Sequence, residues 1–205
     1  MGSVHSNKVV DKFKASVDEF NPVLPVITNL RNDTLKSRHW EMIHDAVGVT
    51  INGKDDFTVQ DLISKNITAH EHDIATIATS AQQESILEEM MAKVLAIWQT
   101  TDFVVMPYKD VKDLYVLGDT SEVITNLDDS LVTINTVLGS RYVSGIRDFV
   151  DLWRSKLMHF QETMDEWLTC QRNWMYLETI FGSPDIIRQL PGPAKTFQAV
   201  DKSFK

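Results

Sequence analysis

Residues 171–191 read QRNWMYLETIFGSPDIIRQLP, and they place aromatic side chains before a helix-breaking Gly182-Ser183-Pro184. Seven residues fall about 20° short of two full helical turns, so side chains at this interval form one slowly rotating stripe. Such a stripe predicts a seam between packed helices, because a cofactor site would need polar groups that converge on one place. The aromatic residues at seven-residue intervals are Trp153, Phe160, Trp167, Trp174 and Phe181.

Helical spacing of apolar residues predicts that most of the chain is α-helical. Thr68 with Glu71 matches a capping box, and Asp119 with Glu122 is a second N-terminal cap. Pro25 and the LRND segment (30–33) are the candidate interruptions of the second helix. The expected helices cover residues 7–20, 23–47, 68–99, 120–138, 141–181 and 184–189.

Two short runs of β-prone residues, 103–106 and 114–117, flank the charged stretch KDVKD (109–113). They predict a β-hairpin with a charged tip. A further turn is expected at Asn52-Gly53. The predicted fold is mostly α: elongated, rod-like helical bundles with one inserted hairpin. Its parts are residues 1–22 (a tag remnant and an N-terminal helix), 23–101 (a first bundle), 102–118 (the hairpin) and 119–205 (a second bundle).

The composition restricts the class of partner. The 205 residues carry a net charge of −9, and an acidic chain lacks the basic face that nucleic acids and anionic membranes require. The single Cys170 excludes an internal disulfide and fits a reducing compartment. Met1-Gly2-Ser3 and the amphipathic residues 191–205 lead us to expect a fragment, monomeric by itself, of a longer chain.

No catalytic, cofactor-binding or metal site is expected from the sequence. His70 and His72 lie two apart, roughly 200° around a helix, so they cannot share an ion. Asp128-Asp129 looks like the start of the magnesium motif of terpene synthases, but Val132 stands where a further carboxylate is needed. Cys170 has no neighbour that would lower its pKa, and we expect a buried structural thiol.

Short motifs spread over residues 23–200 occur in an order that is typical of one family. They resemble the linker region of dynein heavy chains, and the axonemal chains more than the cytoplasmic transport form. In chain order the motifs are Leu30-Arg31-Asn32-Asp33, Arg38-His39-Trp40-Glu41, Gln83-Glu84, Leu87, Trp98, Leu127-Asp128-Asp129, Ser140-Arg141-Tyr142-Val143, Trp153, Leu157, Gln171, Trp174, Tyr176-Leu177-Glu178, Ile180-Phe181, Asp185-Ile186 and Leu190-Pro191.

The resemblance implies a lever that lies across a ring of six ATPase modules and bends and straightens as they turn over ATP. The ring of the same heavy chain and, through the parent motor, microtubules would be the partners. ATP and Mg²⁺ would bind the parent's ring and not this fragment, which would not itself be an enzyme. The expected location is the axoneme of a cilium or flagellum, with the cytoplasm as the alternative. The hairpin tip is expected to contact the ring through Lys109, Asp110, Lys112 and Asp113.

Two other readings remain open on the residues alone. A passive helical scaffold or adaptor that binds a protein partner would use the same aromatic seams. An all-α enzyme of the terpene-synthase type would be stabilised by magnesium.

Overall fold

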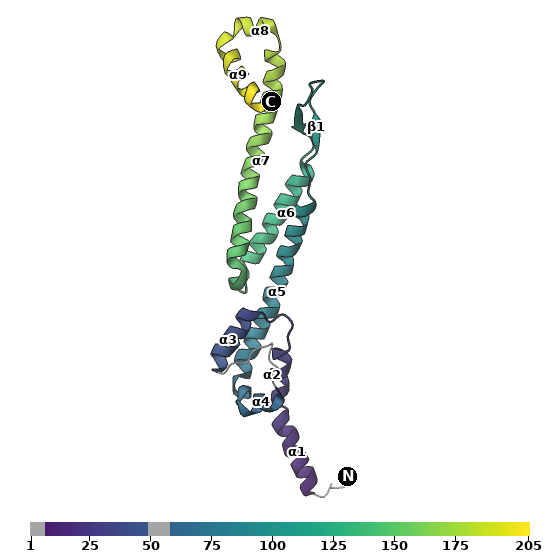
Figure 1. Cartoon of the computed structure of the whole chain (residues 1–205), viewed down its shortest axis with the longest axis vertical. Coiled ribbons are helices and arrows are strands. Elements are labelled where there is room, and N and C mark those ends of the chain that lie inside the picture. The colour runs from purple at the N-terminus through teal and green to yellow at the C-terminus, as the bar shows by residue number, and fades with distance from the viewer. Residues whose placement is uncertain (1–6, 49–57) are drawn as a thin grey trace. The chain divides into compact units, whose positions relative to one another are not determined.

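The computed structural model describes residues 7–48 and 58–205. Within these ranges most residues are helical, and the one sheet is a two-stranded antiparallel pair (Figure 1). The predicted fold class, a mostly α chain with one β-hairpin, is confirmed. The chain divides into two compact units, with the boundary between Glu89 and Met90. The predicted division at residues 22, 101 and 118 stays a prediction.

The first unit begins each helix with a recognisable local signal. Asn7 caps the first helix by accepting the N–H of Val9 at 3.1 Å. Thr58 and Asp61 cap α4 reciprocally, with backbone-to-side-chain distances of 2.8 and 3.2 Å. Gly48 ends α3 with φ at +69°, a conformation that suits glycine because it has no Cβ. The elements are α1 (Lys8–Phe20), α2 (Val23–Leu30), α3 (Ser37–Val47), α4 (Val59–Ser64), the 3-10 helix η1 (Ile67–His70) and the beginning of α5 (Glu71–Thr100).

An apolar core joins α2, α3, α4, η1 and the start of α5. Trp40 is partly buried against this core. Each fully buried aliphatic side chain contributes roughly 1.5–3 kcal/mol through area removed from water, whereas α1 contributes no buried residue. The core therefore fixes α3 to α5 and leaves α1 outside. Its members are Val23, Val26, Leu30, Ile43, Val47, Leu62, Ile67, Ile74 and Ile77.

The second unit is organised around the 35-residue helix α7. α6 lies along α7, and α9 returns beside the end of α7 after the short α8 (Figure 1). Trp98, near the end of α5, donates its indole N–H to the buried Ser130 Oγ of α6 at 3.0 Å. The elements that follow α5 are β1 (Val105–Pro107), β2 (Tyr115–Leu117), α6 (Ser121–Leu138), the 3-10 helix η2 (Ser144–Ile146), α7 (Arg147–Phe181), α8 (Pro184–Gln189) and α9 (Pro191–Phe204).

The predicted hairpin is present, with Met106 opposite Val116 at its centre. Lys109 and Asp113 have positive φ values of 52° and 60° and reverse the chain at the two ends of the tip. One face of the hairpin buries Tyr108 and Leu114 in a cluster with α7 and α9. This packing matters because two short strands have little stability in isolation.

Several predicted helix boundaries are wrong. Of the two candidate interruptions of 23–47, the LRND segment is confirmed, since α2 ends at Leu30 and α3 begins at Ser37. Pro25 does not interrupt the helix, because it lies in the first turn of α2, where its missing N–H costs nothing. α5 begins at Glu71 after η1, so Thr68 does not cap it.

The helix predicted from 141 begins at Arg147, after a turn and η2, which contains the poor helix former Gly145. The expected tag remnant at Met1-Gly2-Ser3 and the expected Asn52-Gly53 turn lie outside the described residues.

Candidate functional site

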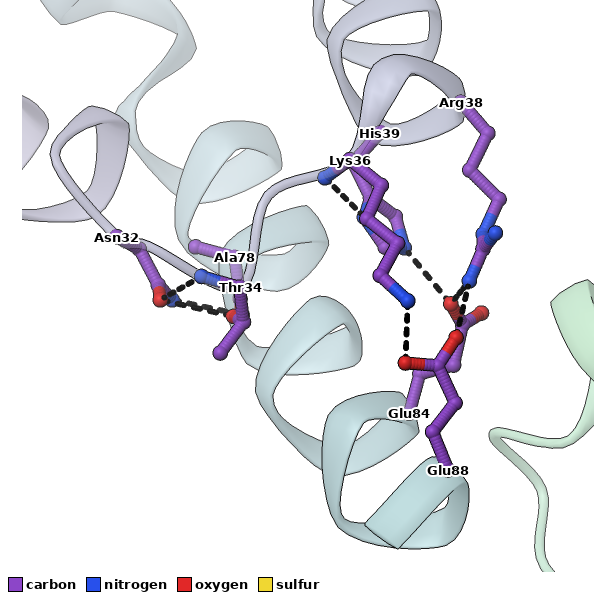
Figure 2. Close-up of polar contacts among 8 residues, drawn as sticks. All are labelled: Asn32, Thr34, Lys36, Arg38, His39, Ala78, Glu84 and Glu88. Atoms are coloured by element: carbon purple, nitrogen blue, oxygen red, sulfur yellow. Dashed lines mark hydrogen bonds and ion pairs between the residues drawn. The ribbon is translucent and has the colours of Figure 1, made fainter. Parts of the chain in front are cut away.

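The Arg38-His39-Trp40 motif lies in the first turn of α3, where its cation meets carboxylates of α5 (Figure 2). Arg38 pairs with Glu84 and with Glu88, and its Nη2 lies 3.1 Å from Glu88 Oε1. Lys36 binds the other oxygen of Glu88. Glu84 and Glu88 are four residues apart and therefore share one face of α5. Two cations at the start of α3 thus face two carboxylates on one helix.

His39 is buried beside this charge cluster. Its Nδ1 accepts the backbone N–H of Lys36 at 3.1 Å, and its Nε2 lies 3.5 Å from Glu84 Oε1 (Figure 2). Burial, followed by the charges of Arg38 and Lys36, lowers the pKa of His39 below its usual value. The accepting Nδ1 also requires an unprotonated nitrogen. His39 is therefore a neutral imidazole that serves as a helix cap.

The loop before α3 is fixed to α5 by Asn32. Its Nδ2 donates to the Ala78 carbonyl at 3.4 Å, while its Oδ1 accepts from Thr34 N–H at 3.1 Å and Thr34 Oγ1 at 2.8 Å (Figure 2). Burial raises the pKa of Glu88, but the hydrogen bonds from Lys36 and Arg38 outweigh that effect and leave the pKa lowered. These contacts hold the α2–α3 loop and the start of α3 on α5.

The hairpin tip places Lys109, Asp110, Lys112 and Asp113 at the surface. Lys109 is already engaged: its Nζ binds Glu178 of α7 and lies 4.9 Å from the Tyr108 ring centroid. The hydrogen bond to Glu178, and then that to Tyr108, raise the pKa of Lys109. Among the described residues, Asp110, Lys112 and Asp113 form no ion pair. The predicted contact of the tip with a partner stays a prediction.

Gln171 of α7 binds the outer edge of β2. Its Oε1 accepts the Leu117 N–H at 2.9 Å, and its Nε2 donates to the Leu117 carbonyl at 2.8 Å. A side-chain amide thus replaces the missing third strand, with the pairing of an antiparallel neighbour. The side chain is only 7% exposed, so these hydrogen bonds are protected from water. The hairpin is therefore attached to α7 along its edge as well as through its buried face.

Trp174, one α7 turn from Gln171, is the centre of an aromatic cluster and is 2% exposed. Its ring stacks on Phe204 of α9, with centroids 4.2 Å apart and an interplanar angle of 11°. The Tyr108 ring lies 4.9 Å away, and the indole N–H donates to Asp201 Oδ1 at 3.0 Å. Trp174 therefore joins the hairpin, α7 and α9.

The other aromatic residues of the series contact different partners along α7. Trp153 and Phe160 are half-buried, and Phe160 meets Trp98 edge-on at 5.4 Å. Trp167 is 49% exposed and lies 6.0 Å from the Phe204 ring. Phe181 stacks on Phe197 of α9 at 5.2 Å. The predicted role of the series in stiffening the chain stays a prediction.

Asp128 and Asp129 are both exposed on α6. Cys170 is exposed too, so the expectation of a buried thiol is wrong. It borders an open groove of about 500 Å³ that is lined by α7 and α9, beside Trp174 and Val200. Within residues 7–48 and 58–205, no three His, Cys, Asp or Glu side chains are placed to hold a metal ion.

Several residues of these clusters were not singled out from the sequence. Glu88 and Lys36 had a usable signal, since Glu84 and Glu88 share a helix face. Tyr108 and Asp201 had no such signal. Tyr108 lies 70 positions from its partner Glu178. Asp201 lies in α9, 27 positions from its partner Trp174 in α7.

The whole chain, residues 1–205, matches the family model "Dynein heavy chain, N-terminal region 2". It is 43% identical to human "Dynein axonemal heavy chain 6" over 200 residues, which is 97% of this chain and 5% of that protein. It is 34% identical to human "Dynein axonemal heavy chain 1" over 94% of this chain and 4% of that protein.

A third similar protein is the "Dynein-1-beta heavy chain, flagellar inner arm I1 complex" of Chlamydomonas reinhardtii, which is 33% identical over 96% of this chain and 4% of its own length. The chain thus spans about a twentieth of the length of these relatives. The motif order, the helical units with one hairpin and the match over all 205 residues agree, and the chain therefore belongs to the dynein heavy chain family.

Proposed function

We propose that this chain is a segment of the mechanical linker of a dynein motor, and that it transmits the ATP-driven conformational change of the AAA+ ring to the tail. The observation that carries the proposal is α7, an uninterrupted helix of 35 residues and about 52 Å. The hairpin and α9 are both attached to it through Gln171 and Trp174. The protein is cytoskeletal and belongs to the axoneme of a cilium or flagellum, as its axonemal and flagellar relatives indicate.

A lever has to pass on force without deforming, and the contacts along α7 suit that task. Aromatic side chains bury a large area per residue and pack at the density of a crystal, so a helix braced by them resists bending. In our proposal Trp153, Phe160, Trp167, Trp174 and Phe181 brace α7 against its neighbours. The bend at Gly182 then directs the chain into α8 and α9.

The chemistry of the motor lies elsewhere in the parent chain under this proposal. The ring binds ATP and Mg²⁺ and hydrolyses the nucleotide, while the segment supplies no catalytic group and holds no cofactor. Its direct partner is the ring of the same heavy chain, and microtubules are reached through the parent motor; neither nucleic acid nor a membrane is a partner. Among the described helices, none is both long and apolar enough to cross a bilayer.

The hairpin tip supplies the test. Asp110 and Lys112 are exposed and unpaired within the described residues, whereas Lys109 is occupied by Glu178. Exchanging the two charges, as Asp110→Lys with Lys112→Asp, keeps the net charge and leaves the core contacts in place. We expect the full-length motor carrying both changes to fold normally and to move microtubules more slowly in a gliding assay.

The control exchanges Asp185 and Arg188 of α8, which are exposed like Asp110 and Lys112 but form an ion pair with each other. It should leave the gliding velocity unchanged. If both double variants glide at the wild-type velocity, the tip has no part in the stroke. If the motor binds its partners and still glides normally after deletion of the whole hairpin, a passive scaffold becomes the better description of this segment of the motor.

A further inference from the structure

The first helix of the chain, α1, presents apolar side chains to solvent along one face. It buries none of its residues, and Phe13 is 70% exposed while Val10 is 48% exposed. A 13-residue helix is marginal in water by itself, and helices in proteins are stabilised mainly by packing an apolar face. An exposed face of this kind therefore indicates a missing partner.

The spacing of the exposed residues defines the geometry of that partner. Val10, Phe13, Val17 and Phe20 follow one another at intervals of three, four and three, which are the a and d positions of two heptads. We call these four residues the α1 stripe. A stripe with a mean spacing of 3.5 residues packs against another helix at a shallow angle, with side chains inserted between those of the partner. The geometry thus favours a helix over a strand or a loop.

The charges beside the α1 stripe indicate the chemistry of that helix. Lys14 occupies the e position, next to the seam, and the g positions hold the uncharged Val9 and Ser16. Lys14 forms no ion pair within the described part of the chain. The acidic Asp18 and Glu19 fall at b and c, away from the seam. Since charges at e and g set the choice of partner, an acidic residue beside the partner's apolar stripe would complement Lys14.

A second copy of α1 does not satisfy this requirement. In a parallel pair Lys14 would face Val9 or Ser16, which gives no ion pair, and in an antiparallel pair it would face the other Lys14, which is repulsive. A helix of the same polypeptide has the further advantage that it is held at a high effective concentration. The relatives are about twenty times longer than this chain, since it covers 5% of the first of them.

We infer that the α1 stripe docks on an amphipathic helix of the same heavy chain that lies outside residues 1–205 and carries Asp or Glu beside its apolar face. α1 is then a coupling helix that joins the first unit to another part of the polypeptide. The inference rests on the family and on the α1 stripe, and it does not require the lever function.

A photo-crosslink from within the α1 stripe tests this inference in the full-length heavy chain. Phe13 is replaced by the photoreactive p-benzoylphenylalanine, which keeps an aromatic ring at that position, and the exposed Ala15 on the opposite face is replaced in the control. On irradiation we expect a product of heavy-chain mass in which the photoreactive residue at position 13 is joined to a helix outside residues 1–205. That helix should carry Asp or Glu beside its apolar face. The Ala15 control should give no such product.

Other crosslinking outcomes would overturn the inference. A product of about twice the heavy-chain mass would mean a second copy, a product with a different polypeptide would mean an associated subunit, and a link within residues 1–205 would mean a local contact. A yield from Phe13 no greater than that from Ala15 would mean that the α1 stripe is free in the motor.

Hydrogen exchange gives a second readout that needs no substitution. The amides of α1 should exchange at least about tenfold more slowly in the full-length heavy chain than in the 205-residue chain, because docking suppresses local opening. Equal rates in the two proteins would contradict the inference. Neither experiment uses motility, so a failure here is distinguishable from a failure of the lever proposal.

Discussion

Trp174 and Trp167 occupy equivalent positions in the seven-residue series, but their surroundings differ. Trp174 is 2% exposed and contacts Tyr108, Phe204 and Asp201, whereas Trp167 is 49% exposed. We expect Trp174→Ala to lower the free energy of unfolding by about 3–5 kcal/mol, because the cavity cannot close without moving three elements. Trp167→Ala, which loses one stacked ring, should cost about 0.5–1.5 kcal/mol. Urea unfolding of the 205-residue chain measures both, and equal losses would mean that Trp174 is not the centre of the cluster.

The buried His39 gives the first unit a pH-dependent stability whose sign follows from its surroundings. Burial, together with the charges of Arg38 and Lys36, holds the pKa of the imidazole below its ordinary value of 6.5. Between the lowered pKa and 6.5 the unfolded chain binds more protons than the folded chain, so the free energy of unfolding rises with pH. We therefore expect the urea midpoint to fall as the pH is lowered from about 7.5 to about 5.5.

Replacing His39 with Gln should flatten that pH dependence, whatever it does to the absolute stability. The exposed His159 is the control, and His159→Gln should keep the wild-type slope. Glu88, whose pKa is also lowered from 4.5, loses its contribution only as the pH falls below about that value, so its effect lies outside this window. An unchanged slope in His39→Gln would show that the imidazole is not held neutral.

Among the elements, the hairpin depends on a single side chain for the pairing of its outer edge. Gln171 both accepts from and donates to the backbone of Leu117. In Gln171→Glu the carboxylate can still accept the N–H, but it sets an oxygen against the Leu117 carbonyl. We expect the attachment of the hairpin to weaken by about 1–3 kcal/mol, the cost of an unsatisfied buried polar group. The measurement is the exchange rate of the Leu117 amide, which should increase.

Gln82→Glu is the matched control for this prediction, because it makes the same change at an exposed position of α5. It should leave the Leu117 amide unaffected. If the Leu117 amide exchanges at the same rate in the two variants, Gln171 does not hold the hairpin edge, and the hairpin is attached through Tyr108, Leu114 and the Lys109–Glu178 pair.

Local signals predicted the elements where they were complete. The hairpin followed from two β-prone runs around a charged stretch, and the position of α8 followed from Ser183-Pro184. α4 was missed although Thr58 and Asp61 form a capping box, because six residues are too few to show a helical period. Helix starts were misplaced where a 3-10 helix precedes the α-helix, since the two have similar backbone dihedral angles and differ in their hydrogen bonding.

At the scale of the whole chain, the family was predictable and the contacts of the candidate site were not. The motif order from Leu30 to Pro191 carried the family, and the match over residues 1–205 agrees with it. Nothing in the neighbourhood of Lys109 indicates that it pairs with Glu178, 69 positions away. Nor does the seven-residue period distinguish Trp174 from Trp167, because burial depends on which other elements reach α7. Such contacts are set by long-range packing rather than by local sequence.

The size and location of the native polypeptide decide between a motor segment and a free-standing protein. Since the chain covers 5% of the first relative, an antibody raised against it should detect a polypeptide about twenty times larger than 23.4 kDa. We expect that band to be enriched in isolated axonemes relative to the cell body. The same band confined to cytoplasm would keep the motor and contradict the axonemal location. A band near 23.4 kDa would mean a protein that acts alone, and the passive scaffold would then replace the lever as the description of its function.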